Sequence, residues 1–272
     1  MKHIVFSIAT VTYNAEACIE TTLDSILAQT YPHKEFLLID GASKDRTLDL
    51  VRDRQADLER CCKGGIILRS EPDKGLYDAM NKAIRTATGH YLIFLNAGDR
   101  FHAPDTLAQV AAALSKRESA WPDILYGQTD IVDAAGNYLR PRHYLAPEHL
   151  TARSFLQGML VCHQAFWPSL ALIRHNRPAA PDPAAETAAE ESAPVEYDLR
   201  YRYSADYDWC IRLLRQSREN FYTRLTLIDY LDEGLTTRNH RASLRERFRV
   251  MAAHYGLPAT LLSHLRILLR KL

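Results

Sequence analysis

Short apolar runs alternate with helical patterns over the first hundred residues, and this alternation restricts the chain to few folds. Four runs are typical of buried strands, at residues 4–10, 36–39, 66–68 and 90–95. Between them, apolar residues recur every three or four positions, as in amphipathic helices, over 19–27, 48–58 and 76–87. Strands that alternate with such helices form a mostly parallel sheet covered on both faces. The sequence therefore predicts an α/β fold with a Rossmann-like central sheet flanked by helices.

The second half of the chain is less regular. A hairpin signal, Ala135-Gly136-Asn137, separates expected strands at 124–132 and 138–144. A further strand over 159–167, a helix over 206–214 and a closing strand over 221–229 are also expected. Residues 176–194 are rich in Pro, Ala and Glu and have few large apolar side chains, so we expect a mobile loop there.

Polar residues follow each of the four predicted strands. They are Thr10, Thr12, Tyr13 and Asn14, then Asp40, then Asp73, Lys74 and Gly75, and finally Asn96, Gly98 and Asp99. The carboxyl ends of parallel strands meet at one edge of a sheet, where open α/β sheets bind ligands. Carboxylates there can hold ribose hydroxyls, and glycines let the backbone approach a ligand. The sequence therefore predicts a nucleotide crevice. It contains neither the Gly-x-Gly-x-x-Gly fingerprint nor a P-loop, which disfavours dinucleotide cofactors and P-loop chemistry.

Two interpretations of Asp99 remain open from the residues alone. A carboxylate at the end of a buried strand can hold a hard divalent cation, which can neutralise a diphosphate. Alternatively, Asp99 closes an ordinary strand-to-loop turn.

Composition excludes some classes of protein. The chain has 34 Lys and Arg against 33 Asp and Glu, so no basic excess supports nucleic-acid binding. The five cysteines lack metal-type spacing and fit free thiols in a reducing compartment. No signal-peptide pattern and no apolar run of roughly 18 residues is present, so a cytoplasmic protein is expected.

Residues 242–272 are expected to form two amphipathic helices broken at Gly256-Leu257-Pro258. In the second helix one face carries Leu261, Leu262, Leu265, Leu268, Leu269 and Leu272, and the other carries His264, Arg266, Arg270 and Lys271. Packing of the leucine face on the domain is the commoner fate of such a helix. The alternative is a basic helix lying peripherally on an anionic membrane at its inner, cytoplasmic face.

Several strings carry a family resemblance. Ser7–Asn14, Ser25–Pro32 and Asp40–Asp45 resemble the opening of inverting family-2 glycosyltransferases of the GT-A fold. Asp73–Lys82 is similar to a bacterial subgroup active in surface-polysaccharide assembly. Beyond residue 100 the resemblance rests on shorter matches, namely His163-Gln164, Ala205-Asp206-Tyr207-Asp208 and Gly234.

The resemblance implies an architecture and a reaction. Residues 1–241 would form the GT-A domain, with a nucleotide-binding half at 1–100 and a smaller acceptor-side half at 101–241, followed by the helices of 242–272. A sugar would pass with inversion from a nucleotide-diphosphate donor, most commonly a UDP-sugar, to a hydroxyl of a sugar or lipid-linked sugar in polysaccharide or glycolipid assembly.

The resemblance also assigns residue roles. Thr10, Thr12, Tyr13, Asn14 and Asp40 would belong to the nucleotide site, with Asp73, Lys74, Gly75 and Asn81 near the donor. Asn96, Ala97, Gly98 and Asp99 match the Asp-x-Asp metal motif, so Asp99 would bind Mn²⁺ or Mg²⁺. Asp206 matches the catalytic base, which takes the proton of the attacking hydroxyl.

Departures from the family pattern leave alternatives open. Asn96 replaces the first carboxylate of the metal motif, and Ala205 replaces an acidic residue before the base. Asp208 competes with Asp206 as the base, although it could equally be a first-turn carboxylate of a helix. Asn81 could simply cap or brace its helix, and His163 or His240 could touch the diphosphate or the metal. A degenerate, non-catalytic nucleotide-sugar-binding or assembly subunit is the rival function. A sugar nucleotidyltransferase is disfavoured because no Gly-rich basic loop follows the first strand.

Overall fold

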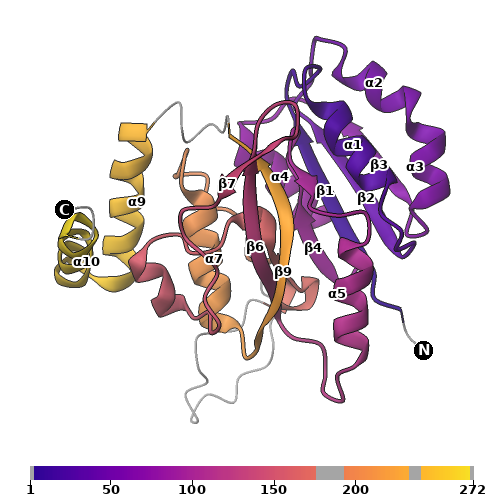
Figure 1. Cartoon of the computed structure of the whole chain (residues 1–272). Coiled ribbons are helices and arrows are strands. Elements are labelled where there is room, and N and C mark those ends of the chain that lie inside the picture. Colours follow the sequence, from indigo (N-terminus) through magenta and orange to yellow (C-terminus); the bar gives the residue numbers. More distant parts are fainter. Residues whose placement is uncertain (1–2, 176–192, 233–239, 270–272) are drawn as a thin grey trace.

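The computed structural model describes residues 3–175, 193–232 and 240–269. Its first half is a four-stranded parallel sheet in the order β3-β2-β1-β4 (Figure 1). The strands are β1 (Phe6–Thr12), β2 (Lys34–Asp40), β3 (Ile66–Ser70) and β4 (Tyr91–Phe94). β1, β2 and β4 are buried throughout, as expected for strands covered on both faces. The predicted parallel sheet is therefore confirmed.

Helices connect these strands at the predicted places. They are α1 (Ile19–Leu27), α2 (Thr47–Asp53), α3 (Gln55–Cys61) and α4 (Leu76–Thr86). The single helix expected over 48–58 is two helices that meet at Arg54. α1 begins only at Ile19, and Asn14, with a positive φ of 51°, belongs to the loop that precedes it.

A second, mixed sheet has the order β5-β9-β6-β7, and β8 also pairs with β6. Its strands are β5 (Arg100–Phe101), β6 (Ile124–Val132), β7 (Tyr138–Pro141), β8 (Phe166–Pro168) and β9 (Asn220–Leu231). The predicted hairpin is confirmed, since β6 and β7 are antiparallel and Gly136 turns between them with φ of 83°.

The strand expected over 159–167 is wrong for most of its length. The 3-10 helix η1 (Ala152–Gln157) ends before this region, and residues 159–162 belong to no helix or strand. The 3-10 helix η2 (His163–Ala165) follows, and only Phe166–Pro168 is a strand. The apolar pattern was misleading because it is interrupted by His163 and Gln164. Their side chains contact Asn96 and Asp99, which follow β4.

The remaining helices are α5 (Thr106–Ser115), α6 (Leu170–His175), α7 (Ala205–Gln216), α9 (His240–Tyr255) and α10 (Leu257–Leu269). Trp209 of α7 stacks on Tyr197 and meets Phe94 and Phe166 edge-on, so it joins the two sheets in one core. Of the predicted mobile loop, residues 176–192 lie outside the described residues, as does Gly234. No described helix has the length and apolar character needed to cross a bilayer.

The two C-terminal helices form as predicted, but the packing of the leucine face on the domain is wrong for the leucines described. Thr260 and Ser263 are buried, whereas Leu261, Leu262 and Leu265 are about half exposed. The side chains of residues 267–272 lie outside the described part of the chain, and with them Leu268, Leu269, Leu272, Arg270 and Lys271.

Candidate active site

A cavity of about 990 Å³ opens at the carboxyl ends of β1 and β2 and the start of α4. We call it the donor cavity after the nucleotide-donor site that the sequence predicts at this edge of the sheet. Five of the predicted nucleotide-site residues line it, namely Thr12, Tyr13, Asp73, Lys74 and Gly75. The segment before α7 closes the other wall with Leu199, Tyr201 and Arg202. No sequence pattern predicted these wall residues, because they lie more than a hundred residues from the ends of the four predicted strands.

Asp40 does not line the donor cavity but holds its lining residue Thr12 in place. It is fully buried and accepts hydrogen bonds from Thr12 Oγ1 at 2.8 Å, Ser43 N at 2.9 Å and Ser70 Oγ at 2.6 Å. Burial alone would raise the pKa of Asp40, but these hydrogen bonds outweigh it and hold the pKa below its ordinary value. Asp40 is therefore an ionised anchor that fixes Thr12 and the following loop.

Tyr13, Gly41 and Asp73 lie close together in the wall of the donor cavity. Tyr13 is 64% exposed, so its ring is available to a ligand. A Cβ at Gly41 would lie only 2.5 Å from Asp73 Oδ2 and 3.4 Å from the Tyr13 ring. Glycine at this position lets Asp73 and Tyr13 approach the loop after β2.

Asn14 organises the same loop rather than the cavity wall. Its N–H donates to Ser43 Oγ at 2.8 Å, and its Oδ1 accepts from Lys44 N at 2.9 Å. These two bonds use the left-handed backbone of Asn14, which its short polar side chain stabilises.

The turn before α4 presents Lys74 to the donor cavity. Gly75 has φ of 114°, and its N–H donates to Asp73 Oδ1 at 2.7 Å. The exposed Lys74 forms no ion pair with another described residue. A free ammonium beside the positive end of a helix is suited to an anionic ligand such as a diphosphate.

Asn81 does not line the donor cavity. It is buried in α4, and its side-chain amide donates to Tyr197 O at 2.9 Å and accepts from Tyr197 N at 2.7 Å. These bonds attach the segment before α7 to α4. Asn81 is therefore a bracing residue, which is one of the two roles that the sequence left open.

Asp206 lies at the start of α7, next to the donor cavity. Its Oδ1 accepts from the hydroxyl of Tyr77, a cavity-lining residue, at 3.1 Å. Its Oδ2 lies 3.4 Å from His163 Nδ1. Burial alone would raise the pKa of Asp206, but the hydrogen bond from His163 is the largest of the effects that bring this pKa below its ordinary value. The site therefore holds an ionised carboxylate that can accept a proton.

Asp208, the competing candidate base, is occupied elsewhere. Its Oδ2 accepts from Arg212 Nε at 2.7 Å, and its Oδ1 lies 2.7 Å from His254 Nε2 of α9. These partners tie α7 to α9 and leave Asp206 as the carboxylate that contacts a cavity residue.

The loop after β4 does not line the donor cavity, so the predicted site residues Asn96, Gly98 and Asp99 are not among its walls. Asp99 is 3% exposed, and it accepts hydrogen bonds from Gln164 Nε2 at 2.9 Å and from Leu231 N at 3.1 Å. Burial raises the pKa of Asp99 to about 6. Gly98 has φ of 96°, and a Cβ there would lie 2.7 Å from Leu231 Cδ2, so only glycine lets the loop pack against β9.

Two groups of this loop fit a divalent cation. The Oδ1 of Asn96 is buried without a hydrogen-bond partner among the described residues. Asp99 is a buried carboxylate with no ion pair to a described cation, and each of its oxygens keeps a second lone pair. Amide and carboxylate oxygens are ligands that hard cations prefer.

Thr10 is fully buried, and its Oγ1 has no partner among the described residues. It does not line the donor cavity.

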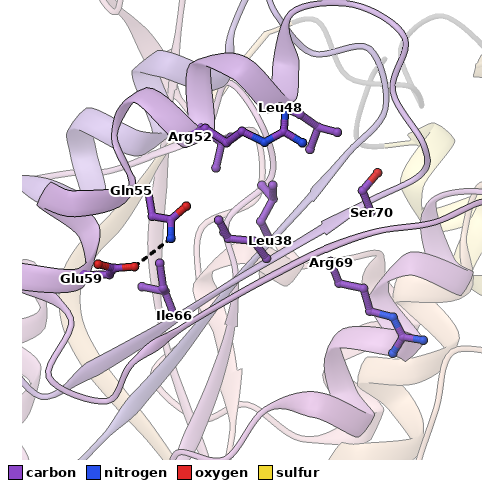
Figure 2. A pocket seen from close by; sticks show the side chains of 10 residues that line it. Leu38, Leu48, Arg52, Gln55, Glu59, Ile66, Arg69 and Ser70 are labelled. Atoms are coloured by element: carbon purple, nitrogen blue, oxygen red, sulfur yellow. Dashed lines mark hydrogen bonds between the residues drawn. The ribbon is translucent and has the colours of Figure 1, made fainter.

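Two further features lie outside this site. A second cavity, of about 490 Å³, is lined by residues of the helices α2 and α3 and the strands β2 and β3. Figure 2 shows the side chains that line it, among them Leu38 and Ile66. It contains none of the predicted nucleotide-site residues. Sequence reasoning also missed a group of metal-type ligands, His102, Asp130 and Asp229. Asp229 is already neutralised there by Arg100, whose Nε lies 2.9 Å from its Oδ2.

Comparison with known proteins identifies relatives of the whole arrangement. The family model described as glycosyl transferase family 2 matches residues 7–170. The chain is 34% identical over 209 residues to a PGL/p-HBAD biosynthesis glycosyltransferase of Mycobacterium tuberculosis, covering 76% of this chain and 69% of the relative. It is 30% identical over 216 residues to the amylovoran biosynthesis glycosyltransferase AmsB of Erwinia amylovora, covering 78% and 64%.

Solved structures confirm the α/β fold with a parallel central sheet. S. aureus TarS in complex with UDP-GlcNAc matches with a TM-score of 0.65 at 16% identity, covering 93% of this chain and 68% of TarS. The mannosyltransferase PcManGT from Pyrobaculum calidifontis, in complex with GDP-Man and Mn²⁺, matches with a TM-score of 0.54 at 18% identity, covering 97% and 74%. On the match to the family model and to relatives of 30% identity or more, the chain belongs to glycosyl transferase family 2.

Proposed function

We propose that this glycosyltransferase moves a sugar from a nucleotide-diphosphate donor to an acceptor hydroxyl with inversion, and that Asp206 is the base. The observation that carries the proposal is the position of Asp206, an ionised carboxylate linked to the donor cavity through the hydroxyl of Tyr77. It is supported by the saturation of Asp208, which removes the competing carboxylate.

The donor occupies the donor cavity. The exposed ring of Tyr13 suits stacking against a base, and Asp73 suits hydrogen bonds from ribose hydroxyls. Lys74 and the N-terminus of α4 face the diphosphate. A UDP-sugar is the donor we propose, because structural neighbours were solved with UDP-GlcNAc and UDP, and GDP-Man is the alternative from PcManGT.

The reaction is a single displacement. The acceptor oxygen attacks the anomeric carbon from the side opposite the diphosphate, and its proton passes to Asp206 as the new C–O bond forms. The bond between the anomeric carbon and the diphosphate oxygen breaks, and the nucleoside diphosphate leaves with the electron pair. One base and one attack give an inverted anomeric centre. Lys74 offsets the negative charge that develops on the leaving group.

Asp99 and Asn96 would hold a divalent cation, Mn²⁺ or Mg²⁺. When bound, the cation supplies positive charge that stabilises the departing diphosphate. A buried carboxylate that lacks a counter-charge and an unpaired amide oxygen both support this assignment.

The domain limits follow the same proposal. We assign residues 1–241 to the transferase domain, with the acceptor side in 101–241, and residues 242–272 to the C-terminal region. The helix α9 begins two residues before this limit, at His240. The relatives are named for glycolipid and exopolysaccharide biosynthesis, so we propose a sugar or lipid-linked sugar as the acceptor.

Two measurements test the proposal. The first is the melting temperature with UDP, GDP, dTDP or CDP, each with and without Mn²⁺, since a ligand at about 100 times its Kd adds roughly 2.7 kcal/mol. The second is transfer by Asp206→Asn, which should bind the donor normally but release almost no nucleoside diphosphate. Asp105→Asn, at an exposed position, is the matched control and should behave as the wild type. Normal turnover by Asp206→Asn would contradict the assignment of the base, and no stabilisation by any nucleotide would favour a non-catalytic assembly subunit.

A further inference from the structure

The last described helix presents its apolar side to solvent. Leu257, Leu261, Leu262 and Leu265 are each 50 to 53% exposed, and three of them recur every four residues along α10. The side toward the protein carries small polar groups instead, since Thr260 and Ser263 are buried and Ser263 Oγ donates to Leu156 O. An exposed stripe of leucines of this kind marks an interaction surface.

The neighbouring helix α9 adds positive charge. Arg241, Arg245 and Arg249 recur every four residues, are exposed, and form no ion pair with a described residue. The one acidic residue within 241–266 is Glu246. Its carboxylate is not available to these arginines, because it accepts the backbone N–H groups of residues 202–204.

Arginine and leucine side chains meet in one groove. A depression of about 350 Å³ between η1 and α10 is lined by Arg153 and Arg266 together with Leu156 and Leu262. Neither arginine forms an ion pair with a described residue. A groove with two free guanidinium groups beside apolar side chains is suited to a phosphate group attached to an acyl chain.

We propose that the exposed sides of α9 and α10 and the adjoining groove, which we call the tail surface, dock onto an anionic phospholipid bilayer. The half-exposed leucines would enter the boundary between headgroups and acyl chains, as in helices that lie in the plane of a membrane. The arginines would contact lipid phosphates, each contributing to binding at an anionic surface. Charge argues against a second copy as the occupant, because a symmetric contact would bring the arginines of two tail surfaces together.

The tail surface lies at the opposite edge of the molecule from α2 and α3 (Figure 1). It connects to the active site through Glu246, which holds the N–H groups of Arg202 and Ser204 at 2.8 and 2.7 Å. Arg202 lines the donor cavity, and Ser204 precedes α7 and its Asp206. If the proposed function is right, a docked enzyme would meet an acceptor hydroxyl that is anchored in the same bilayer; this clause alone rests on that function.

Vesicle flotation of the full chain tests the docking without donor or acceptor, so its outcome does not depend on transfer. We expect binding to vesicles that contain phosphatidylglycerol, no binding to pure phosphatidylcholine, and weaker binding at high salt. Leu261→Ser/Leu265→Ser and Arg245→Gln/Arg249→Gln should each lower the apparent affinity about thirtyfold, which corresponds to about 2 kcal/mol.

Matched controls lie away from the tail surface. Leu139→Ser, at a half-exposed leucine of β7, and Arg52→Gln, on α2, should bind as the wild type does. Unchanged melting temperatures would show that the tail variants fold. The proposal is overturned if the full chain does not bind phosphatidylglycerol vesicles or if the tail variants bind equally well. A dimer seen by light scattering and abolished by Leu261→Ser/Leu265→Ser would also overturn it, by showing that a second copy covers the leucines.

Discussion

His163 is the residue whose substitution examines the proposed base most closely. Its Nδ1 lies 3.4 Å from Asp206 Oδ2, and its Nε2 lies 3.3 Å from Asn96 Nδ2. An amide nitrogen can only donate, so Asn96 assigns Nε2 as the acceptor of a neutral ring and places the proton on Nδ1, directed at Asp206. The imidazole therefore orients the base and lowers its pKa.

The magnitude follows from the bond that is lost. A hydrogen bond to a charged group contributes about 1.5 to 3 kcal/mol, so His163→Leu should lower kcat roughly ten- to a hundredfold. The KM for the donor should change little, because His163 does not line the donor cavity. His163→Asn is the matched variant, because its amide nitrogen can occupy the place of Nδ1 and should restore part of the rate.

The pH dependence gives a readout that loss of packing would not change. With His163 removed, burial dominates and the pKa of Asp206 rises, while Tyr77, Arg247 and the N–H of Tyr207 remain around it. A base acts only when deprotonated, so the acidic limb of the kcat profile should move to higher pH in His163→Leu. Equal losses in the Leu and Asn variants with an unmoved acidic limb would refute the reasoning and leave His163 as a packing residue.

Three further variants probe the surrounding structure. Asp208→Asn should lower the free energy of unfolding by about 3 kcal/mol, because it removes the charge of a buried carboxylate that is paired with Arg212. Folding lowers the pKa of Asp208, so this difference should be present at neutral pH and should vanish as the pH falls below about 4. Denaturant titrations at several pH values measure it. Asp99→Asn should abolish any melting shift produced by Mn²⁺. A Mn²⁺-induced melting shift that survives in this variant would contradict the assignment of Asp99 as a ligand. In the wild type without metal, folding raises the pKa of Asp99 to about 6, so ionisation of Asp99 should make the folded protein less stable as the pH rises from about 4 to 6. Gly41→Ala should raise the KM for the donor with little change in melting temperature, because the added methyl displaces Asp73 and Tyr13, and an unchanged KM would show that neither contacts the donor.

The parallel sheet could be predicted because strands buried on both faces are continuously apolar and each ends in polar residues. β2 shows this clearly, since its apolar core stops at Asp40 and all seven of its residues are buried. The strand over 159–167 could not be excluded in the same way. Its polar members, His163 and Gln164, are buried in the protein because they contact Asn96 and Asp99. Each contact joins residues more than sixty positions apart, so a local sequence pattern does not reveal it.

The donor cavity was predictable only where its residues follow strands. Thr12, Tyr13 and the turn before α4 are found there. Asp40 and Asn14 do not line the cavity; they hold Thr12 and the loop after β2 in place through hydrogen bonds. Spacing alone does not distinguish a residue that lines a cavity from one that holds the lining in place, because both follow the same strand. The orientation of α10 was hidden for a related reason, since an amphipathic pattern indicates that two faces differ but not which face meets the protein.

The choice between Asp206 and Asp208 shows how a distant helix decides the role of neighbouring residues. Both carboxylates are in the first turn of α7, where either suits the helix dipole. Residues of α9 give the two carboxylates different roles. His254 binds the carboxylate of Asp208, and Glu246 accepts hydrogen bonds from the N–H groups just before α7. Asp206 is thereby left facing Tyr77 and the donor cavity. The same helix carries the exposed arginines of the tail surface, so removing α9 would disturb the base as well as the docking. In the described part of the chain, the exposed leucines of α10 form no hydrogen bond with Glu246 or His254. Substitutions at these leucines are therefore the changes that separate membrane contact from catalysis.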